Sequence, residues 1–244
     1  MIEIKWEDCN IPRTIFISGK KRHGKDLFAG QLRTQLRKLE KGNFTFGDDT
    51  TTYCVHNIRV SKISFADPIK QFAKLAFGLS EDQVNGGTKH KESPIPFWNG
   101  LTPREIMQQI GSNLREIDED VFAKSLITRL KQRRMDAGAC RAKPWTYRNT
   151  GENHIFINSD CRYPNEIKVA RKNLSNVVFI RIVRPGKEST GFDTHPSEIA
   201  LDDYRQWDHV VTNDMDIPLL RSKAEMLVAS WAGIDANSYA NLTI

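Results

Sequence analysis

The sequence predicts an α/β protein with a mostly parallel sheet of five strands. Short apolar, β-branched runs alternate along the 244 residues with stretches in which apolar residues recur every three or four positions, which is typical of strands separated by helices. A glycine-bearing turn joins the first such run to the first such stretch. Neither an internal repeat nor a linker divides the chain, so we expect residues 1–244 to form one domain with helices on both faces of the sheet.

The first strand and helix are the most clearly marked elements. Residues 14–18 are apolar or β-branched and are followed by Gly19, so they predict a buried strand. Beyond Gly24 the helical spacing is carried by Phe28, Leu32, Leu36 and Leu39. Gly42 marks the end of that helix. For residues 42–57 we expect a polar loop or a small hairpin.

A second unit begins at residues 58–65, an apolar run that predicts a strand. Asp67 and Pro68 then begin a helix that reaches Phe77, with Pro68 as its first helical residue. Glycines and prolines are frequent in residues 78–102, so we expect this segment to be a loop or an excursion rather than a regular element.

The second half of the chain continues the alternation. Apolar residues at helical spacing from Thr102 to Leu130 predict two consecutive helices, and the basic stretch 131–151 is expected to be irregular. Three further strands are predicted at residues 155–157, 177–180 and 209–211, and helices at 164–173 and 216–232.

Composition excludes several classes of protein. The chain has no run of about 18 apolar residues, and its first ten residues lack the basic-then-apolar order of a signal peptide, so we expect a cytoplasmic protein with no membrane partner. Four scattered cysteines without a CxxC pair indicate neither a zinc site nor disulfides. The formal net charge of +6 favours anionic partners, either nucleic acid or substrates that carry several phosphates.

The strongest motif is the turn GKKRHGKD at residues 19–26, which fits the phosphate-binding pattern GxxxxGK between a strand and a helix. Glycines let such a loop direct its N–H groups inward, the helix N-terminus adds partial positive charge, and Lys25 can reach the β- and γ-phosphates of a nucleotide. A merely structural turn would leave Lys20, Lys21 and Arg22 repelling one another without an anion. The residues predicted to bind ATP are Gly19, Lys20, Lys21, Arg22, His23, Gly24, Lys25, Asp26 and Leu27.

Asp26 departs from the pattern, which usually has Ser or Thr at this position to bind Mg²⁺. A carboxylate is also a hard oxygen ligand, so Asp26 would hold the metal directly or through water. It would equally orient Lys25 or cap the helix, and the sequence leaves these roles open.

A second constellation follows the predicted strand at 155–157. Asp160 comes where that strand ends, and because ligands gather at the C-terminal ends of parallel strands, it is a candidate Mg²⁺ ligand. Arg162 would project into the same crevice and bind an acceptor phosphate through two parallel hydrogen bonds. The structural alternative is a local ion pair between Asp160 and Arg162.

Further candidates for substrate binding lie in two segments. Asp67 and Lys70 follow the second strand, while Arg104 and Gln108 lie on successive turns of one helix, where they would read a base and a phosphate. Any solvated helix carries such residues, so position alone does not decide. The long polar connection 184–208 is typical of a lid.

Together these segments resemble the bacteriophage deoxynucleoside monophosphate kinases. The resemblance runs over roughly residues 14–225 and is carried by ISGKKRHGKD at 17–26, DCRYPNE at 160–166, VRPG at 183–186, DTHPSE at 193–198 and VTND at 211–214. Family members commonly have Ser and Thr where this chain has His23 and Leu27. These departures leave the backbone role of the loop intact but put its hydroxyl contacts in doubt.

The resemblance implies a P-loop fold similar to adenylate kinase, with ATP and Mg²⁺ as cofactors. The implied reaction passes the γ-phosphate of ATP to a deoxynucleoside monophosphate (dNMP), giving ADP and the deoxynucleoside diphosphate. The implied catalytic residues are Lys25, Asp160 and Arg162, and the implied metal ligands are Asp26 and Asp160. The implied substrate contacts are Asp67, Lys70, Arg104, Gln108, Arg162, Glu166, Arg184, His195 and Glu198.

The resemblance also implies an organisation around a single kinase domain. An acceptor-binding excursion is expected over about 67–150 and a lid-like loop over about 184–208. The expected partners are the small substrates alone, without stable nucleic acid, and a homodimer is compatible with the sequence. A phage-encoded member of the family would act in the host cytoplasm.

Two alternatives remain open. Animal-type phosphomevalonate kinases share the KRxGKD turn and the DxR element, so another small phosphorylated acceptor is possible. A nucleic-acid-binding P-loop ATPase would use the basic stretch 129–148, although only Trp145 and Tyr147 are available there for base stacking. Because much of the positive charge gathers around the predicted phosphate site, the sequence favours a role of this charge in binding phosphorylated substrates over a role in binding nucleic acid.

Overall fold

A computed structural model describes residues 1–46, 51–139, 153–186 and 196–234. Its central sheet has five strands in the order β4-β5-β2-β6-β7, and every neighbouring pair is parallel. The strands are β2 (Thr14–Ser18), β4 (Arg59–Lys62), β5 (His154–Asn158), β6 (Val177–Val183) and β7 (His209–Thr212). The predicted α/β class and five-stranded parallel sheet are confirmed.

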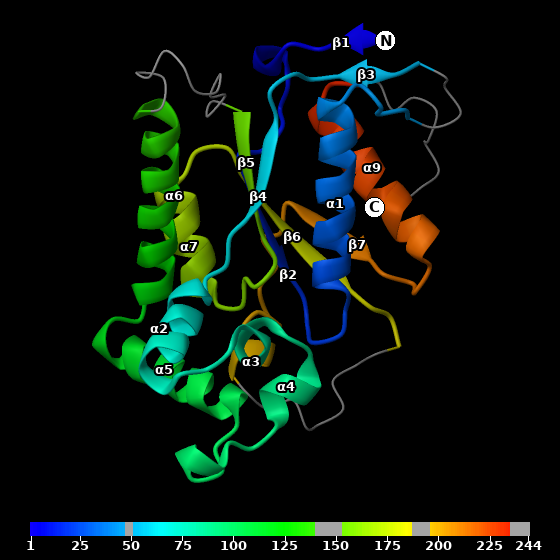
Figure 1. Ribbon diagram of the computed structural model, residues 1–244. Coiled ribbons are helices and arrows are strands. Elements are labelled where there is room, and N and C mark those ends of the chain that lie inside the picture. Colours follow the sequence, from blue (N-terminus) through cyan, green and yellow to red (C-terminus); the bar gives the residue numbers. More distant parts are fainter. Residues whose placement is uncertain (47–50, 140–152, 187–195, 235–244) are drawn as a thin grey trace.

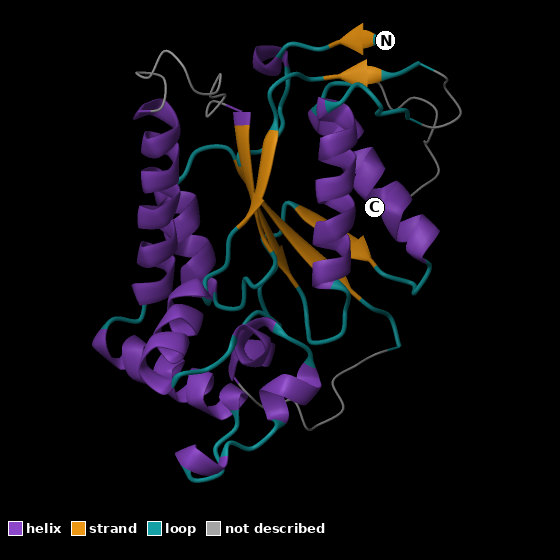
Figure 2. Cartoon of the chain, in the orientation of Figure 1, coloured by secondary structure: helices purple, strands orange, loops and turns teal. Residues whose placement is uncertain are grey.

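Helices cover both faces of this sheet (Figures 1 and 2). α1 (Lys25–Glu40) and α9 (Ile217–Trp231) lie on one face, and α6 (Val121–Ala139) and α7 (Pro164–Asn173) lie on the other. The alternation of side chains along β2 explains the two layers, because successive residues of a strand point to opposite faces.

The two faces of β2 belong to two separate cores. Ile15 and Ile17 pack in the core under α1 and α9, whereas Phe16 packs in the core under α6 and α7. Phe16 stacks there on Phe179 and Phe65, with ring centroids 4.8 and 5.7 Å apart. β2 is thus buried on both faces, as a central parallel strand must be.

A small helical layer lies beyond the C-terminal end of β4. It consists of α2 (Asp67–Phe77), α3 (Glu81–Asn85), α4 (Thr88–Glu92), the 3-10 helix η2 (Pro96–Trp98) and α5 (Pro103–Ile117). It has its own apolar core, to which Ala73, Val84 and Ile106 contribute. This layer forms one wall of the cavity described below.

The chain also forms a second, small sheet. β1 (Ile2–Glu3) pairs in parallel with β3 (Tyr53–Cys54), beside the 3-10 helix η1 (Trp6–Asp8). Tyr53 forms a single antiparallel bridge with Phe44, which is the only hairpin-like contact among the described residues of 42–57. Residues 47–50 lie outside the described part.

Four local predictions are wrong. Residues 78–102 contain α3, α4 and η2, because Ser80 and Gln83 form a capping box and Gly86–Gly87 separates two short helices rather than preventing them. The irregular stretch expected from 131 begins later, since α6 continues to Ala139. The strand expected at 58–65 ends at Lys62, and Pro68 is the second helical residue of α2, not the first.

Within the described residues, no helix is long and apolar enough to cross a membrane.

Candidate active site

The GxxxxGK turn joins β2 to α1, with Gly24 as the residue that precedes the helix. Gly24 has φ +94° and Gly19 has φ +150°, conformations that residues with a side chain rarely adopt. A Cβ on Gly19 would also lie 2.6 Å from the carbonyl oxygen of Ile182. The backbone of this loop therefore depends on glycine at both positions.

The neighbouring strands β6 and β7 hold the loop in place. The buried Asn213 side chain, just after β7, donates to the carbonyl oxygen of His23 over 2.8 Å. The Nδ1 atom of His23 lies 3.4 Å from the carbonyl oxygen of Ile182, and Arg184 donates to the carbonyl oxygen of Arg22 over 3.3 Å. Arg184 was predicted to contact substrate, and in this structure it contacts the loop.

Lys25 is buried at the base of the loop. Its Nζ atom donates to the carbonyl oxygen of Lys20 over 2.8 Å. Burial, and next the charge of Arg162, lower the pKa of Lys25 to about 8, while Glu198 and Asp26 oppose the shift. The charge of Arg162 thus acts on Lys25, and the contacts of Glu198 described below link Arg162 to the same loop.

Asp26 has partners of its own on the neighbouring strand ends. Its Oδ1 atom accepts from the Ser159 hydroxyl over 2.6 Å and lies 3.3 Å from Lys62 Nζ. Partial burial works against ionisation, but the Ser159 hydrogen bond and the Lys62 charge hold the pKa of Asp26 below its usual value. A carboxylate and a hydroxyl thus meet at the start of α1.

Asp160 is engaged with the backbone that leads into α2. Its carboxylate accepts from the backbone N–H of Phe65 over 3.1 Å, from that of Ala66 over 3.2 Å and from the Ser64 hydroxyl. Asp160 therefore fixes the turn between β4 and α2, and the structure places no ion pair between Asp160 and Arg162 among the described residues.

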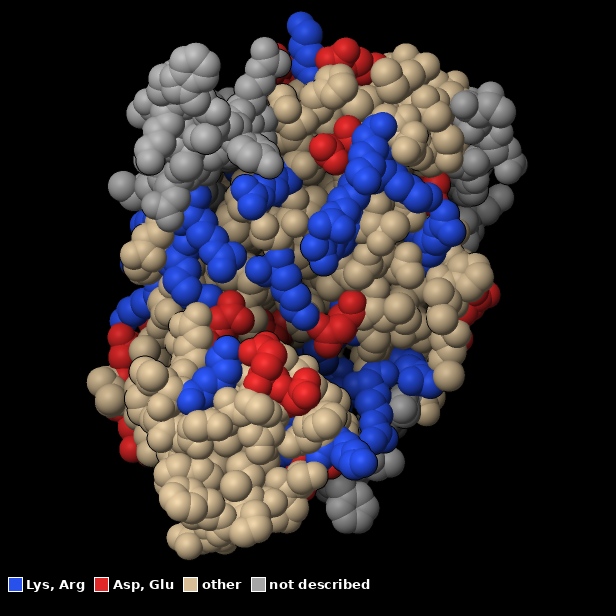
Figure 3. Space-filling view, in the orientation of Figure 1, with Lys and Arg blue, Asp and Glu red and all other residues tan. Residues whose placement is uncertain are grey.

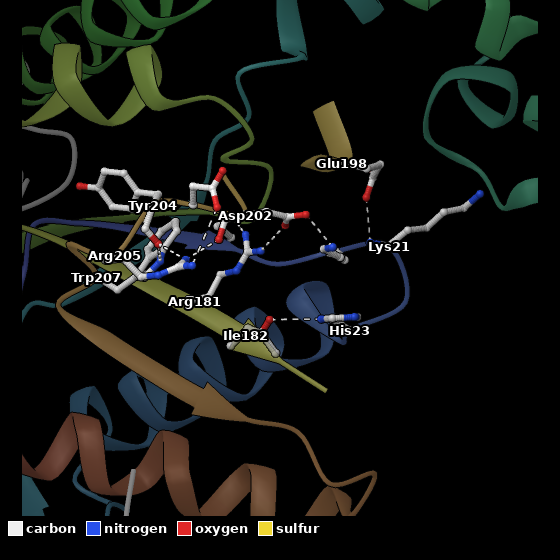
Figure 4. Close-up of polar contacts among 12 residues, drawn as sticks. Lys21, His23, Arg181, Ile182, Glu198, Asp202, Tyr204, Arg205 and Trp207 are labelled. Atoms are coloured by element: carbon white, nitrogen blue, oxygen red, sulfur yellow. Dashed lines mark hydrogen bonds and ion pairs between the residues drawn. The ribbon is translucent and has the colours of Figure 1, made fainter. Parts of the chain in front are cut away.

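Arg162 lies between the loop and a short helix, α8 (Pro196–Ile199). Its NH1 atom is 2.6 Å from a Glu198 carboxylate oxygen and 3.3 Å from the Ser197 hydroxyl. The other Glu198 oxygen accepts from the backbone N–H of Lys21 over 2.9 Å (Figure 4). One carboxylate thus bridges the GxxxxGK turn and Arg162, the predicted acceptor arginine.

A cavity of about 250 Å³ opens beside Arg162, between the sheet and the small helical layer. The predicted residues that line it are Lys70, Arg104, Gln108, Asp160, Arg162 and Glu166. The sequence therefore identified most of the polar wall of this cavity, and the fold brings residues from α2, α5 and the end of β5 together there.

Glu166 supports the Arg162 segment from below. One of its carboxylate oxygens accepts from the backbone N–H of Arg162 over 2.7 Å and of Tyr163 over 3.1 Å. The side chain is buried, and burial raises the pKa of Glu166 to about 8, although the two N–H groups act in the opposite direction. Glu166 is thus first a support for the turn that presents Arg162.

Other predicted residues lie away from this cavity or outside the described part of the chain. Asp67 forms an ion pair with Arg129 at 2.7 Å, which ties α2 to α6. Leu27 is on the exposed side of α1. His195 lies outside the described residues.

Among the cavity residues that the sequence reasoning missed are Lys91, Arg115 and Tyr163. Lys91 lies on α4, in the segment for which no helix was expected, and burial followed by the charges of Lys70 and Arg104 lowers its pKa. Arg115 places its guanidinium carbon 4.3 Å from the ring centre of Tyr163. Arg115 lies one helical turn after Gly111, which also lines the cavity, so the helical spacing of α5 was the one signal that could have identified Arg115.

A parallel five-stranded sheet with a glycine-dependent GxxxxGK turn between β2 and α1 defines a P-loop kinase-like α/β protein. The sequence is 31% identical over 173 residues to a protein of Acanthamoeba polyphaga mimivirus named "Putative deoxynucleotide monophosphate kinase", a match that covers 68% of this chain and 81% of the viral protein. The chain therefore belongs to the deoxynucleotide monophosphate kinase family, and as a kinase it uses ATP as phosphate donor. No family model matches the sequence.

Two solved structures give only distant likenesses. A sugar kinase from a Janibacter species aligns with a TM-score of 0.39 and 14% identity over 95% of this chain and 99% of that one. A structure titled as a putative kinase from Chloroflexus aurantiacus aligns with a TM-score of 0.36 and 12% identity, over 91% and 98% of the two chains. TM-scores this low carry no argument about this chain.

Proposed function

We propose that this chain transfers the γ-phosphate of ATP to a deoxynucleoside monophosphate, giving ADP and the deoxynucleoside diphosphate. The observation that carries the proposal is the position of Arg162, which lines the cavity and also meets, through Glu198, the backbone of the phosphate-binding loop. A donor site and an acceptor site that share one arginine suit transfer between two phosphorylated molecules. The name of the viral relative supports the choice of acceptor.

The acceptor would bind in the cavity with its phosphate toward the cations. Lys70, Lys91 and Arg104 come from three different helices to one cavity wall, and Arg104 forms an ion pair with Glu92 at 3.1 Å. Half-buried like charges repel one another, and a phosphate among them would relieve that repulsion. This segment is the proposed acceptor-binding part of the excursion over about 67–150.

Asp26 and Ser159 fit a Mg²⁺ ion that arrives with ATP. Mg²⁺ keeps several waters and is commonly held by one or two carboxylates together with substrate phosphates, so a full cage of protein ligands is not required. In the part of the chain that is described, no three His, Cys, Asp or Glu side chains form such a cage. When bound, the ion would neutralise charge on the β- and γ-phosphates.

The chain would promote the reaction by position and charge. An oxygen of the acceptor phosphate attacks the γ-phosphorus, the bond from that phosphorus to the β,γ-bridging oxygen breaks, and ADP leaves with the electron pair. Lys25 and the loop N–H groups would hold the donor phosphates, while Arg162 would hold the acceptor phosphate. The connection 184–208, whose described part includes α8, is the proposed lid.

The proposal is tested by measuring ADP formation from ATP and Mg²⁺ with each of the four common dNMPs, with the matching ribonucleotides and with phosphomevalonate. We expect at least one dNMP to raise the rate well above the acceptor-free rate. A rate that rises only with phosphomevalonate would assign a different acceptor. If no compound raises the rate, the proposed function is wrong, and steeply salt-dependent DNA binding beside that result would favour a nucleic-acid-binding ATPase.

A further inference from the structure

The Glu198 carboxylate occupies an anion-binding position inside the site. Its two oxygens accept from the Lys21 backbone N–H at 2.9 Å and from the Arg162 guanidinium at 2.6 Å. A loop N–H and an arginine are also the groups that recognise phosphate oxygens. The negative charge of Glu198 also acts on the buried Lys25, where it favours the protonated amine.

Glu198 cannot stay in this position when the donor phosphates bind the loop and the acceptor phosphate binds Arg162 from the cavity. Its side chain is 12% exposed and its charge faces the loop, so a substrate phosphate placed there would meet a like charge at close range. Arg162 is 39% exposed and lines the cavity, so an acceptor phosphate can reach the guanidinium that Glu198 holds. The acceptor phosphate and Glu198 therefore compete for the same guanidinium.

The segment that carries Glu198 is anchored elsewhere, so the carboxylate can leave without unfolding its surroundings. Asp202 forms ion pairs with Arg181 at 3.3 Å (Figure 4) and with Lys20 at 2.7 Å. Leu201 is buried in the core under α6 and α7. Glu198 lies three residues before Leu201, on the four-residue helix α8, none of whose residues is fully buried.

We propose that Glu198 is a specificity-determining residue that keeps Arg162 away from the reaction until an acceptor phosphate displaces it. With ATP alone, Arg162 stays with the Glu198 carboxylate, so attack of water on the γ-phosphorus receives no help from the guanidinium. With the acceptor present, its phosphate replaces the carboxylate on Arg162 and the transfer proceeds. Glu198 thus favours the acceptor over water as the attacking molecule, an inference that rests on the proposed function.

The test compares Glu198→Gln with Asp203→Asn. Both changes remove one negative charge from the same segment, but Asp203 is fully exposed and its nearest cation, Arg205, is 3.9 Å away on the surface. Glutamine keeps the size of Glu198 and loses the ion pair with Arg162. Two quantities are measured on each protein: the rate of ADP and inorganic phosphate formation from ATP without acceptor, and the Kd of inorganic phosphate for the ATP-free protein.

For Glu198→Gln we expect acceptor-independent hydrolysis to rise about tenfold or more and the Kd of inorganic phosphate to fall about tenfold, because a buried charged competitor is removed. Asp203→Asn should match the wild type in both. If Glu198→Gln binds phosphate no more tightly than Asp203→Asn, or hydrolyses ATP no faster, the inference is wrong.

The phosphate titration separates this inference from the proposed function, because it needs neither ATP nor a dNMP. A wild type that phosphorylates no dNMP overturns the proposed function, whereas an unchanged phosphate affinity in Glu198→Gln overturns the competition at Arg162. If Glu198→Gln does not fold, Glu198→Ala replaces it with the same expected fall in Kd, since it also removes the carboxylate that competes for Arg162.

Discussion

At the scale of single residues, Lys25 is where the fold acts most directly on the chemistry. In the ligand-free chain its pKa is about 8, so the amine is protonated below that pH and neutral above it. A phosphate against Nζ favours the charged form and raises the pKa again. ATP binding should therefore take up a proton when the solution is above pH 8.

This linkage predicts that wild-type affinity for ATP falls as the pH rises from about 7 to 9.5, and that the variant Lys25→Arg largely loses this dependence because arginine stays charged. Isothermal titration in buffers of different ionisation enthalpy measures the proton uptake directly. Equal proton uptake by the wild type and Lys25→Arg above pH 8 would show that another group titrates.

Residue types and spacing were enough to predict the loop, Lys25 and Arg162 as candidates, because phosphate binding needs particular side chains at fixed intervals, and the structure brings the loop and Arg162 together through Glu198. The metal-ligand role of Asp160 stays a prediction, since a carboxylate after a strand suits a metal ligand and a helix cap equally. The structure gives Asp160 two backbone N–H partners at the entry to α2. Residue types and spacing also missed Lys91, because its neighbours Lys70 and Arg104 lie 21 and 13 residues away in the sequence.

At the scale of elements, the phosphate-binding loop depends on a strand that supplies none of its residues. Asn213 follows β7, is buried, and connects that strand to the carbonyl oxygen of His23. A second hydrogen bond, from the backbone N–H of Met215 to its Oδ1 atom, fixes the orientation of the amide. The position of the loop is thus set by the sheet on the side away from the cavity.

We expect Asn213→Ala to weaken ATP binding about tenfold and to lower the melting temperature, because a buried carbonyl loses its donor at a cost of about 1–3 kcal/mol. The acceptor affinity should change little, since Asn213 does not line the cavity. Asp203→Ala, at a fully exposed position with only a surface ion pair, serves as the control. Unchanged ATP affinity in Asn213→Ala, measured by titration, would mean that the loop holds its shape without β7.

The strands and long helices were predictable because their apolar periods are long and unbroken. The short helices α3 and α4 were not, since five residues span little more than one turn and show no period. Their place is fixed instead by tertiary packing, for example by Val84, which is fully buried against α2 and α5. The part of the cavity wall that these two helices form could therefore not be predicted from the sequence.

At the scale of the whole molecule, the excess of positive charge divides between the site and other surfaces. Figure 3 shows Lys and Arg side chains gathered over the middle of one face, with Asp and Glu between them. Some of the cations lie away from the cavity, in a groove between α1 and β4 that Arg33, Arg37, Lys41 and Arg59 line. Only part of the positive charge therefore lies around the candidate active site. The basic stretch 140–148 lies outside the described residues.

The most direct test of the central claim follows the γ-phosphate itself. Each dNMP is incubated with γ-labelled ATP, Mg²⁺ and either the wild type or Arg162→Ala, and the labelled products are separated. We predict that the wild type places the label in the deoxynucleoside diphosphate, and that Arg162→Ala does so more slowly by a factor on the order of 10²–10³. Label that enters inorganic phosphate alone, or an Arg162→Ala variant as fast as the wild type, would contradict the account.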